Sequence, residues 1–341
     1  MAHDLSWGGL LRGLLVLASI WWAWAAYAWL TNEVDSRRWS VRLAIFGAMI
    51  AMLLASLAIP GAFEDDALLF ALAYLGVRLM HIALFATGTE NVDVRDAARA
   101  LALTATLAPA LLIVASAFDG TAQIAIWVVA LVIDYAGAGL RGIGGWRLSP
   151  GHFAERHGLI VIIALGESIV AIGVGAKGIA LGGGELLAAA LGVIVAAALW
   201  WTYFDAALDR IEHRLHALPA GRERNTTARD TFSFLHLPLV AGIVLLALGV
   251  KKTLEHVDDE LKLIAAIGLC GGVALYLLAD VAFRRRCLGL LERPRLAAAA
   301  ACAATLPLAT AIPALAALAV VAAICAALVA YESFTRPGRA Y

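Results

Sequence analysis

The stretch that decides the fold is His152–Ser168, HFAERHGLIVIIALGES. It begins with a charged, histidine-rich segment, continues through nine apolar residues and ends on Glu167 and Ser168. In a helix, the residues from His157 to Glu167 span about 15 Å, which is close to half of a hydrocarbon core of roughly 30 Å. A carboxylate at that depth is costly unless it is protonated, paired or in contact with water, so Glu167 is a candidate functional residue.

The composition is that of a membrane protein. Hydrophobic residues make up 62% of the 341 residues and charged residues 15%, and the mean hydropathy is +0.86. A soluble protein of this length needs more polar residues to cover its surface. The four cysteines lie in or beside apolar stretches without metal-binding spacing, so we expect them to pack as small apolar residues, with no metal and no cofactor.

The apolar stretches predict an all-α polytopic bundle of eleven membrane helices. Pro307 and Pro313 interrupt the last Ala-rich stretch, which we interpret as a helical hairpin because one helix across it would be too long for a membrane. The longest connection, 206–231, is rich in Arg and Glu and is predicted to be a solvated loop. The expected helices cover 8–30, 41–60, 66–86, 97–118, 121–140, 157–176, 184–205, 232–250, 261–283, 295–312 and 314–331.

The arginines predict the orientation of the bundle. Twenty of them lie in alternate loops and in the C-terminal tail, whereas the opposite loops hold only Lys177, Lys251, Lys252 and Lys262. The positive-inside rule then predicts a cytoplasmic C-terminus and an N-terminus outside. We expect the clusters, such as Arg284-Arg285-Arg286, to contact anionic lipid head groups. Because the arginines are spread over many loops, nucleic-acid binding is not expected.

Two halves of the sequence share a weak internal repeat. LLVLASIWWAWAAYAWL, with Trp21-Trp22, matches LGVIVAAALWWTYFDAAL, with Trp200-Trp201, and TLAP at Thr106 matches TLP at Thr305. The order of the matches predicts a first membrane repeat of five helices over 1–145 and a second of six helices over 146–341. The Glu167 helix has no counterpart, so the first repeat lacks its first helix. Parallel repeats of this kind are typical of transporters.

Three segments resemble the bacterial low-temperature-requirement A family. They are HFAERHGLIVIIALGES, the Trp200–Asp205 segment WWTYFD, and FSFLHLPLVAGI from Phe232. The resemblance covers nearly the whole chain. It implies a polytopic protein of the bacterial inner membrane, in a family named for a cold-growth phenotype rather than for a reaction. Members usually open with a helix carrying an E-L-F-F-D-L-V-F-V-like motif, which this sequence does not contain; a misplaced start codon would explain its absence.

The polar residues inside the predicted helices are the candidates for substrate or proton binding. Arg78, Asp134 and Glu167 lie at similar depths, about 9 to 15 Å from the arginine-rich side, and opposite charges at one depth are expected to pair. His81 shares a helical face with Arg78, and Ser168 is expected to hydrogen-bond back to its own helix. Further candidates nearer that side are Asp205, His236, Trp200 and Trp201, with Tyr203 and Asp280 adding polar groups.

His152, Glu155 and His157 form the pattern H-x-x-E-x-H. This spacing differs from that of helical zinc motifs, in which two histidines stand four residues apart. Glu155 and His157, two residues apart, do not share a helix face. We interpret Ser149-Pro150-Gly151 as a turn and Glu155 as an acidic residue that favours the start of the following helix.

Three classes of function are compatible with this sequence. The first is a transporter or channel for a small solute or ion, proton-coupled through a buried Glu167. The second is an intramembrane enzyme acting on a lipid or lipid-linked substrate through Glu155 and His157, although no Ser-His-Asp set or two-histidine metal motif is present. The third is a non-catalytic stress-adaptation protein. The repeat and the charges within the membrane favour the first class.

Overall fold

The computed structural model describes residues 4–34, 37–89, 91–140, 146, 148–175, 182–204 and 207–335. These residues are helical apart from turns and one isolated β-bridge between Glu260 and Pro313. They form two compact units. The N-terminal unit consists of residues 11–153 and 218–226, and the C-terminal unit contains residues 4–10, 154–217 and 227–335 as far as they are described.

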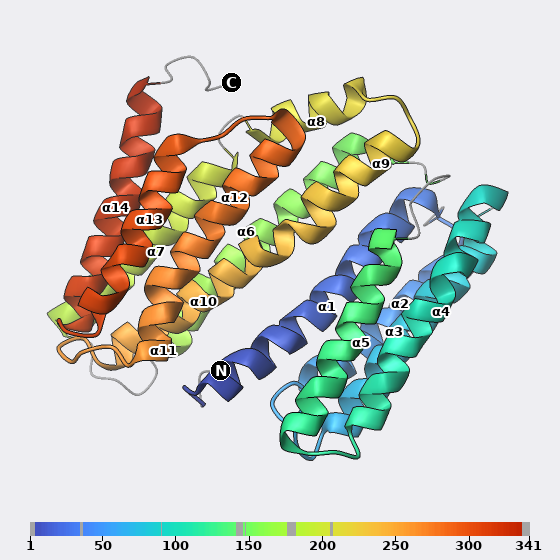
Figure 1. The fold of residues 1–341 in the computed structure, drawn as a ribbon, viewed down its shortest axis with the longest axis horizontal. Helices are drawn as coiled ribbons and strands as arrows, with labels where there is room; N and C mark the ends of the chain where they lie inside the picture. Colours follow the sequence, from blue (N-terminus) through green and yellow to red (C-terminus); the bar gives the residue numbers. More distant parts are fainter. Residues whose placement is uncertain are drawn as a thin grey trace. The chain divides into compact units, whose positions relative to one another are not determined.

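The N-terminal unit is built from long apolar helices, of which α2 to α5 are neighbours in sequence order (Figure 1). Helix α3 contacts α2 and α4, and α4 contacts α5. Aromatic packing forms part of the core, with the Trp127 ring 4.6 Å from that of Phe63 and 5.3 Å from that of Phe70. The helices are α1 (Trp7–Glu33), α2 (Trp39–Leu57), α3 (Ala67–Gly88), α4 (Val92–Ala115) and α5 (Gly120–Leu140).

The C-terminal unit packs α10 against α12, α7 against α14, and α13 against both α12 and α14. Two short π-helical segments, η1 and η2, interrupt its regular helices. Its elements are α6 (Pro150–Gly175), α7 (Gly183–Phe204), α8 (Ala207–Ala217), η1 (Arg229–Phe234), α10 (His236–Glu255), α11 (Leu263–Ala266), η2 (Ile267–Gly271), α12 (Gly272–Leu288), α13 (Arg293–Ala309) and α14 (Ala314–Thr335); α9 (Arg222–Ala228) precedes η1.

Each predicted membrane segment coincides with a helix. Among the described residues, nine helices are long and apolar enough to cross a membrane, and α6 and α13 occupy the other two predicted segments. The predicted hairpin is present, because α13 ends at Ala309 and α14 begins at Ala314. Helix α6 begins at Pro150 instead of residue 157, and proline is well suited to the first turn of a helix. The segment interpreted as a turn is therefore part of α6.

The connection predicted to be a solvated loop is largely helical. Helix α8 carries Ile211 and Leu215 one turn apart, and both side chains are fully buried. Its charged residues occupy the rest of its surface, so α8 is an amphipathic helix attached by one apolar stripe. The high charge content of this segment concealed that stripe.

Glycines allow α10 and α12 to pack backbone against backbone. A Cβ atom added at Gly242 would lie 2.6 Å from the carbonyl oxygen of Gly272 and 2.8 Å from the amide nitrogen of Tyr276. One added at Gly249 would lie 2.4 Å from the amide nitrogen of Leu269. Small residues are favoured at helix interfaces within membranes because they permit this close approach.

Replacing Gly242 by alanine should therefore destabilise the C-terminal unit. The added methyl group must push α10 and α12 apart, and overpacking of this kind costs about 1–3 kcal/mol. Gly166→Ala on α6 is the matched control, because nothing lies within 4 Å of its added Cβ and alanine is intrinsically better than glycine in a helix. Thermal unfolding of the purified protein in detergent should show a lower Tm for Gly242→Ala and an unchanged or higher Tm for Gly166→Ala. Equal Tm values for the two variants would contradict this packing.

Candidate functional site

Arg78 on α3 and Asp134 on α5 form a buried ion pair in the N-terminal unit. Nη2 of Arg78 lies 2.6 Å from Oδ1 of Asp134. Only 4% of the arginine side chain and 2% of the aspartate side chain are exposed. This pairing agrees with the expectation that opposite charges at one membrane depth meet each other.

The ion pair uses only part of the hydrogen-bonding capacity around it. Nε and Nη1 of Arg78 and Oδ2 of Asp134 are buried and have no hydrogen-bond partner among the described residues. Nδ1 of His81 also has no partner there. The Tyr74 hydroxyl makes no hydrogen bond of regular geometry, although Tyr74 and the Trp22 indole both lie beside the Asp134 carboxylate. Tyr74 and His81 stand one helical turn on either side of Arg78. Because each unpaired buried polar group costs about 1–3 kcal/mol, this cluster needs a functional explanation.

The contact with Ala26 fixes which nitrogen of a neutral His81 ring carries the hydrogen. Nε2 of His81 lies 3.1 Å from the carbonyl oxygen of Ala26, and a carbonyl can only accept a hydrogen bond. Nε2 therefore carries the hydrogen and donates it, which leaves Nδ1 of the neutral ring as an acceptor. The polar centre around Arg78 and Asp134 thus offers both donors and acceptors.

A second set of buried charges lies in the C-terminal unit. Arg295 on α13 binds both carboxylate oxygens of Glu332 on α14, at 2.8 and 2.7 Å, and also Oδ2 of Asp280 on α12. Arg284 binds Asp280 through Nε at 3.0 and 3.1 Å. All four side chains are at most 1% exposed, and two positive charges balance two negative ones.

This network also caps α7. The carbonyl oxygen of Thr202, in the last turn of α7, accepts hydrogen bonds from Arg284 and, at 2.7 Å, from Arg295. Carbonyls in the last turn of a helix have no partner within that helix, and cations are favourable there. The network therefore ties the end of α7 to α12, α13 and α14.

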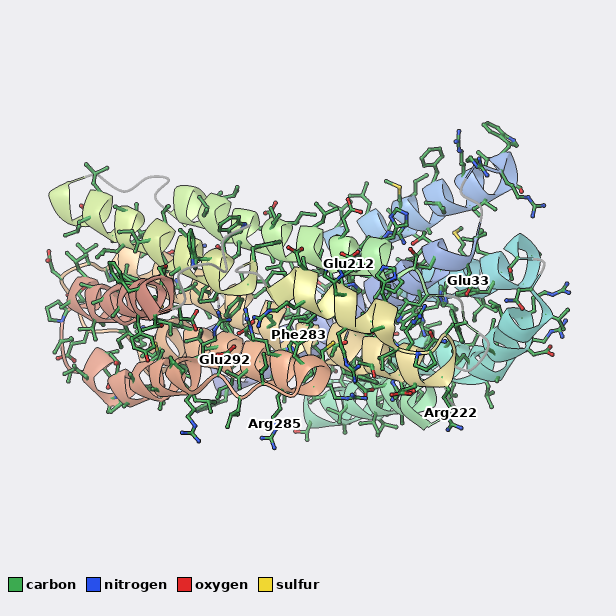
Figure 2. The ribbon with its side chains drawn as sticks, turned by 90° about the horizontal axis from the view of Figure 1, so that it is seen from above. Glu33, Glu212, Arg222, Phe283, Arg285 and Glu292 are labelled. Carbon is green, nitrogen blue, oxygen red and sulfur yellow. The ribbon has the colours of Figure 1, made fainter. Side chains whose placement is uncertain are left out.

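The sequence-based interpretation of the arginine cluster was wrong for Arg284, which is buried in this network. Arg286 binds the exposed side of Asp230, with Nη2 2.9 Å from Oδ2. Arg285 and Arg286 are both exposed, while Phe283 lies among the helices (Figure 2). Consecutive residues of a helix point about 100° apart, so neighbouring arginines meet different surroundings. An Asp four residues before Arg284 was the available signal.

A histidine and aromatic cluster in the C-terminal unit unites two other candidates. The rings of His157 and His236 lie 5.2 Å apart, and both residues are fully buried. Nδ1 of His236 lies 2.9 Å from the carbonyl oxygen of Thr231, so it donates, and Nε2 accepts from the Tyr203 hydroxyl at 2.8 Å. The π-helical turn explains this contact. The backbone N–H of Leu235 donates to the carbonyl oxygen of Asp230, five residues earlier. In a regular α-helix it would donate to the carbonyl oxygen of Thr231, so the π-helical turn leaves that oxygen free to accept from His236.

Glu167 is exposed on α6, on the same face as the exposed Ile163 and Val170. It belongs to the C-terminal unit, whereas Arg78 and Asp134 belong to the N-terminal unit. It forms no hydrogen bond or ion pair with the part of the chain that the structure describes. Ser168 is buried, and its hydroxyl donates to the carbonyl oxygen of Leu165 at 2.6 Å, the expected bond to its own helix.

The remaining candidates do not converge on one site. Glu155 is exposed while His157 is buried, because two residues of a helix so close in sequence point to different sides. Trp200 and Trp201 are 43% and 44% exposed. Asp205 lies outside the described residues. Within the described ranges, no group of three His, Cys, Asp or Glu side chains is placed to hold a metal ion.

Removing Arg295 should unfold the C-terminal unit more readily than removing an exposed arginine. Arg295→Leu leaves Glu332 without its bidentate partner, and breaking a buried pair in this way costs about 3–5 kcal/mol. Arg285→Leu, at the end of the neighbouring α12, removes an exposed charge and should change the free energy of unfolding by less than about 1 kcal/mol. Urea unfolding in detergent micelles gives the free energy of unfolding of each variant. Similar losses of stability in Arg295→Leu and Arg285→Leu would argue against a structural role for the network.

Comparison with known proteins agrees with these features. The family model described as "Bacterial low temperature requirement A protein (LtrA)" matches residues 1–330. An uncharacterized protein of Rhizobium meliloti (strain 1021), RA0937, is 27% identical over 296 residues, which cover 84% of this chain and 72% of that protein. No solved structure matches the chain. The extent of the family match shows that this chain is a multi-pass membrane protein of the bacterial low temperature requirement A family.

Proposed function

We propose that this protein is a transporter or channel-like protein for a small solute or ion, and that the Arg78–Asp134 centre is where the transported species or a coupled proton binds. The observation that carries the proposal is the set of unpaired polar atoms around a buried ion pair in a membrane protein. Polar and charged residues within membrane helices are costly and usually mark a pathway or a binding site.

The chemistry of the centre suits a small polar species. Arg78 supplies two unpaired N–H donors, whereas Asp134 and His81 supply unpaired acceptors. A water molecule or a small polar solute can bridge such groups, since it needs two to four polar partners. A proton arriving at Asp134 would weaken its attraction to Arg78, so protonation and binding at this site are coupled by charge.

Asp134 fits the coupling role better than Glu167. The hypothesis from sequence required a buried glutamate, but Glu167 is exposed, whereas Asp134 is buried beside a counter-charge. The enzyme hypothesis relied on Glu155 and His157 acting together, and the two side chains occupy different environments. Among the described residues, neither the Glu167 hypothesis nor the enzyme hypothesis is supported by a comparable cluster of unpaired polar atoms.

We propose further that the two halves of the chain are parallel repeats. Helix α3 carries Tyr74 and Arg78 four residues apart, and α12 carries Tyr276 and Asp280 at the same spacing, all buried. In both halves, this charged residue joins a network that ends on an acidic residue of the last helix of the expected repeat, Asp134 on α5 or Glu332 on α14. Corresponding polar positions in two halves support a transporter-type architecture.

Removing the polar centre while keeping the fold should abolish transport. The double variant Arg78→Met/Asp134→Leu replaces the ion pair by apolar side chains, an exchange that is often neutral or stabilising. Proteoliposomes containing a pH-sensitive dye, with an imposed proton gradient and membrane potential, should show proton flux for the wild type. The double variant should give the flux of protein-free vesicles.

Asp65→Asn is the control, because Asp65 is an exposed carboxylate in a loop; it should retain the wild-type flux. Wild-type flux from the folded double variant would overturn the assignment of the centre. If the wild type passes no protons, the same vesicles are assayed for counterflow of radiolabelled small solutes. Absence of both activities would remove the transporter proposal.

We propose the orientation predicted by the arginines, with the C-terminus in the cytoplasm. A fluorescent protein fused after Thr335 should then be bright, since it folds in the cytoplasm, whereas alkaline phosphatase fused there should be inactive. Fusions in the acidic loop at Asp65 should give the opposite pair of results. Active phosphatase at the C-terminus would reverse the proposed topology.

A further inference from the structure

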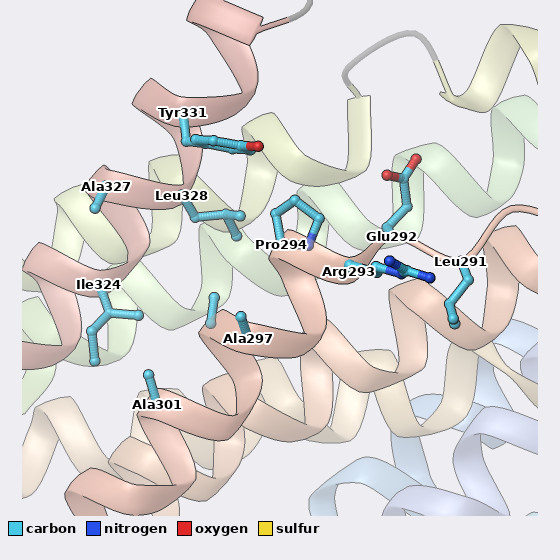
Figure 3. A pocket seen from close by; sticks show the side chains of 11 residues that line it. Leu291, Glu292, Arg293, Pro294, Ala297, Ala301, Ile324, Ala327, Leu328 and Tyr331 are labelled. Atoms are coloured by element: carbon cyan, nitrogen blue, oxygen red, sulfur yellow. The ribbon is translucent and has the colours of Figure 1, made fainter.

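A groove runs between α13 and α14 in the C-terminal unit (Figure 3). It has a volume of about 860 Å³. Its floor consists of small and apolar residues, including Ala297 and Ala301 from α13 and Ile324 and Leu328 from α14. The polar residues that line it, Glu292, Arg293 and Tyr331, lie at one end.

The groove is long enough to cross most of one leaflet of a bilayer. It extends along α13 from Arg293 to Ala301, a rise of about 12 Å at roughly 1.5 Å per residue. One leaflet of a hydrocarbon core of about 30 Å measures about 15 Å. The groove begins at the arginine-rich end of the helices, so it lies in the leaflet on that side.

A positive charge stands at the mouth. Arg293 is exposed and forms no ion pair with any residue that the structure describes, and Tyr331 presents a 54% exposed side chain on the opposite wall. Glu292 also lines the mouth, but its side chain is only 5% exposed, and its carboxylate points away from the Arg293 guanidinium (Figure 3). The mouth lies at the N-terminus of α13, where the helix dipole adds partial positive charge.

We propose that this groove binds an anionic phospholipid from the arginine-rich leaflet. One acyl chain lies along Ala297 and Ala301, and the phosphate accepts hydrogen bonds from the Arg293 guanidinium. An apolar trough that crosses most of one leaflet and has a cationic mouth complements such a lipid in shape and in charge. This site is separate from the Arg78–Asp134 centre and is independent of the transport proposal.

A helix from a second copy of this chain is the competing occupant, because small residues also favour helix–helix contacts in membranes. A two-fold dimer through this groove would use the same surface on both copies. Each Arg293 would then face its counterpart, and the repulsion of like charges opposes that arrangement. Charge therefore favours the lipid.

Native mass spectrometry of the detergent-purified full chain tests the proposal. Titration with phosphatidylglycerol or phosphatidylcholine should show one tightly held phosphatidylglycerol and weaker binding of phosphatidylcholine. Arg293→Gln should reduce phosphatidylglycerol affinity about tenfold or more, since it removes a charge-assisted hydrogen bond. Ala301→Leu should reduce binding of both lipids by filling the groove.

Two matched controls keep the result specific. Arg285→Gln removes another exposed arginine that does not line the groove, and Ala303→Leu enlarges an exposed alanine outside it; both should bind phosphatidylglycerol as the wild type does. Equal affinity for the two lipids in the wild type, or unchanged affinity in Arg293→Gln, would overturn the proposal. So would a lipid-free wild-type dimer that Ala301→Leu converts to a monomer. Because Arg293 lies on the surface, its variant remains informative even if Ala301→Leu fails to fold.

Discussion

A charge that is buried in an apolar helix bundle must be buried together with its counter-charge, and this constraint fixes which helices are neighbours. In the N-terminal unit it joins α3 to α5 through Arg78 and Asp134. In the C-terminal unit it joins α12, α13 and α14 through Asp280, Arg295 and Glu332. Apolar packing is non-directional, whereas an ion pair in a low-dielectric interior tolerates little displacement. The pairs therefore specify the arrangement of helices whose apolar surfaces are otherwise much alike.

The two buried charge clusters differ in how completely the protein satisfies them. The guanidinium of Arg295 donates hydrogen bonds to Glu332, to Asp280 and to the carbonyl oxygen of Thr202. Arg78, in contrast, uses one nitrogen for Asp134 and leaves two nitrogens without partners in the described residues. The network around Arg295 is the more complete of the two, although Nη1 of Arg284 has no partner in the described residues. A largely satisfied network stabilises one structure, while several unpaired groups at a comparable level of burial can bind something else. This contrast assigns a structural role to the first cluster and supports a functional role for the second.

The helices were predictable because membrane thickness fixes their length and composition. The stretch 66–86, for example, corresponds to α3 at Ala67–Gly88. The Arg78–Asp134 pair could also be predicted, since the depth of a residue along a helix follows from its number. Rotation about the helix axis could not be deduced in the same way: residue number gave the depth of Glu167 but did not show that it lies on an exposed face of α6. The same limit separated buried Arg284 from exposed Arg285, which sequence alone treats as one basic cluster.

The irregular backbone of the C-terminal unit follows the same rule as its charges. A π-helical turn gives up a regular helical hydrogen bond, and within a membrane the freed carbonyl needs another donor. At η1 that donor is Nδ1 of His236, whose Nε2 in turn accepts from Tyr203. Both nitrogens of His236 are thus committed to holding the turn, so this histidine is better explained as a structural residue than as a proton carrier. His81, with Nε2 committed to the carbonyl oxygen of Ala26 and Nδ1 without a partner in the described residues, keeps one nitrogen that can accept a hydrogen bond from a solute. The hydrogen bonds of the two histidines therefore differ in kind: those of His236 are used within the fold, whereas His81 retains one acceptor nitrogen beside Arg78.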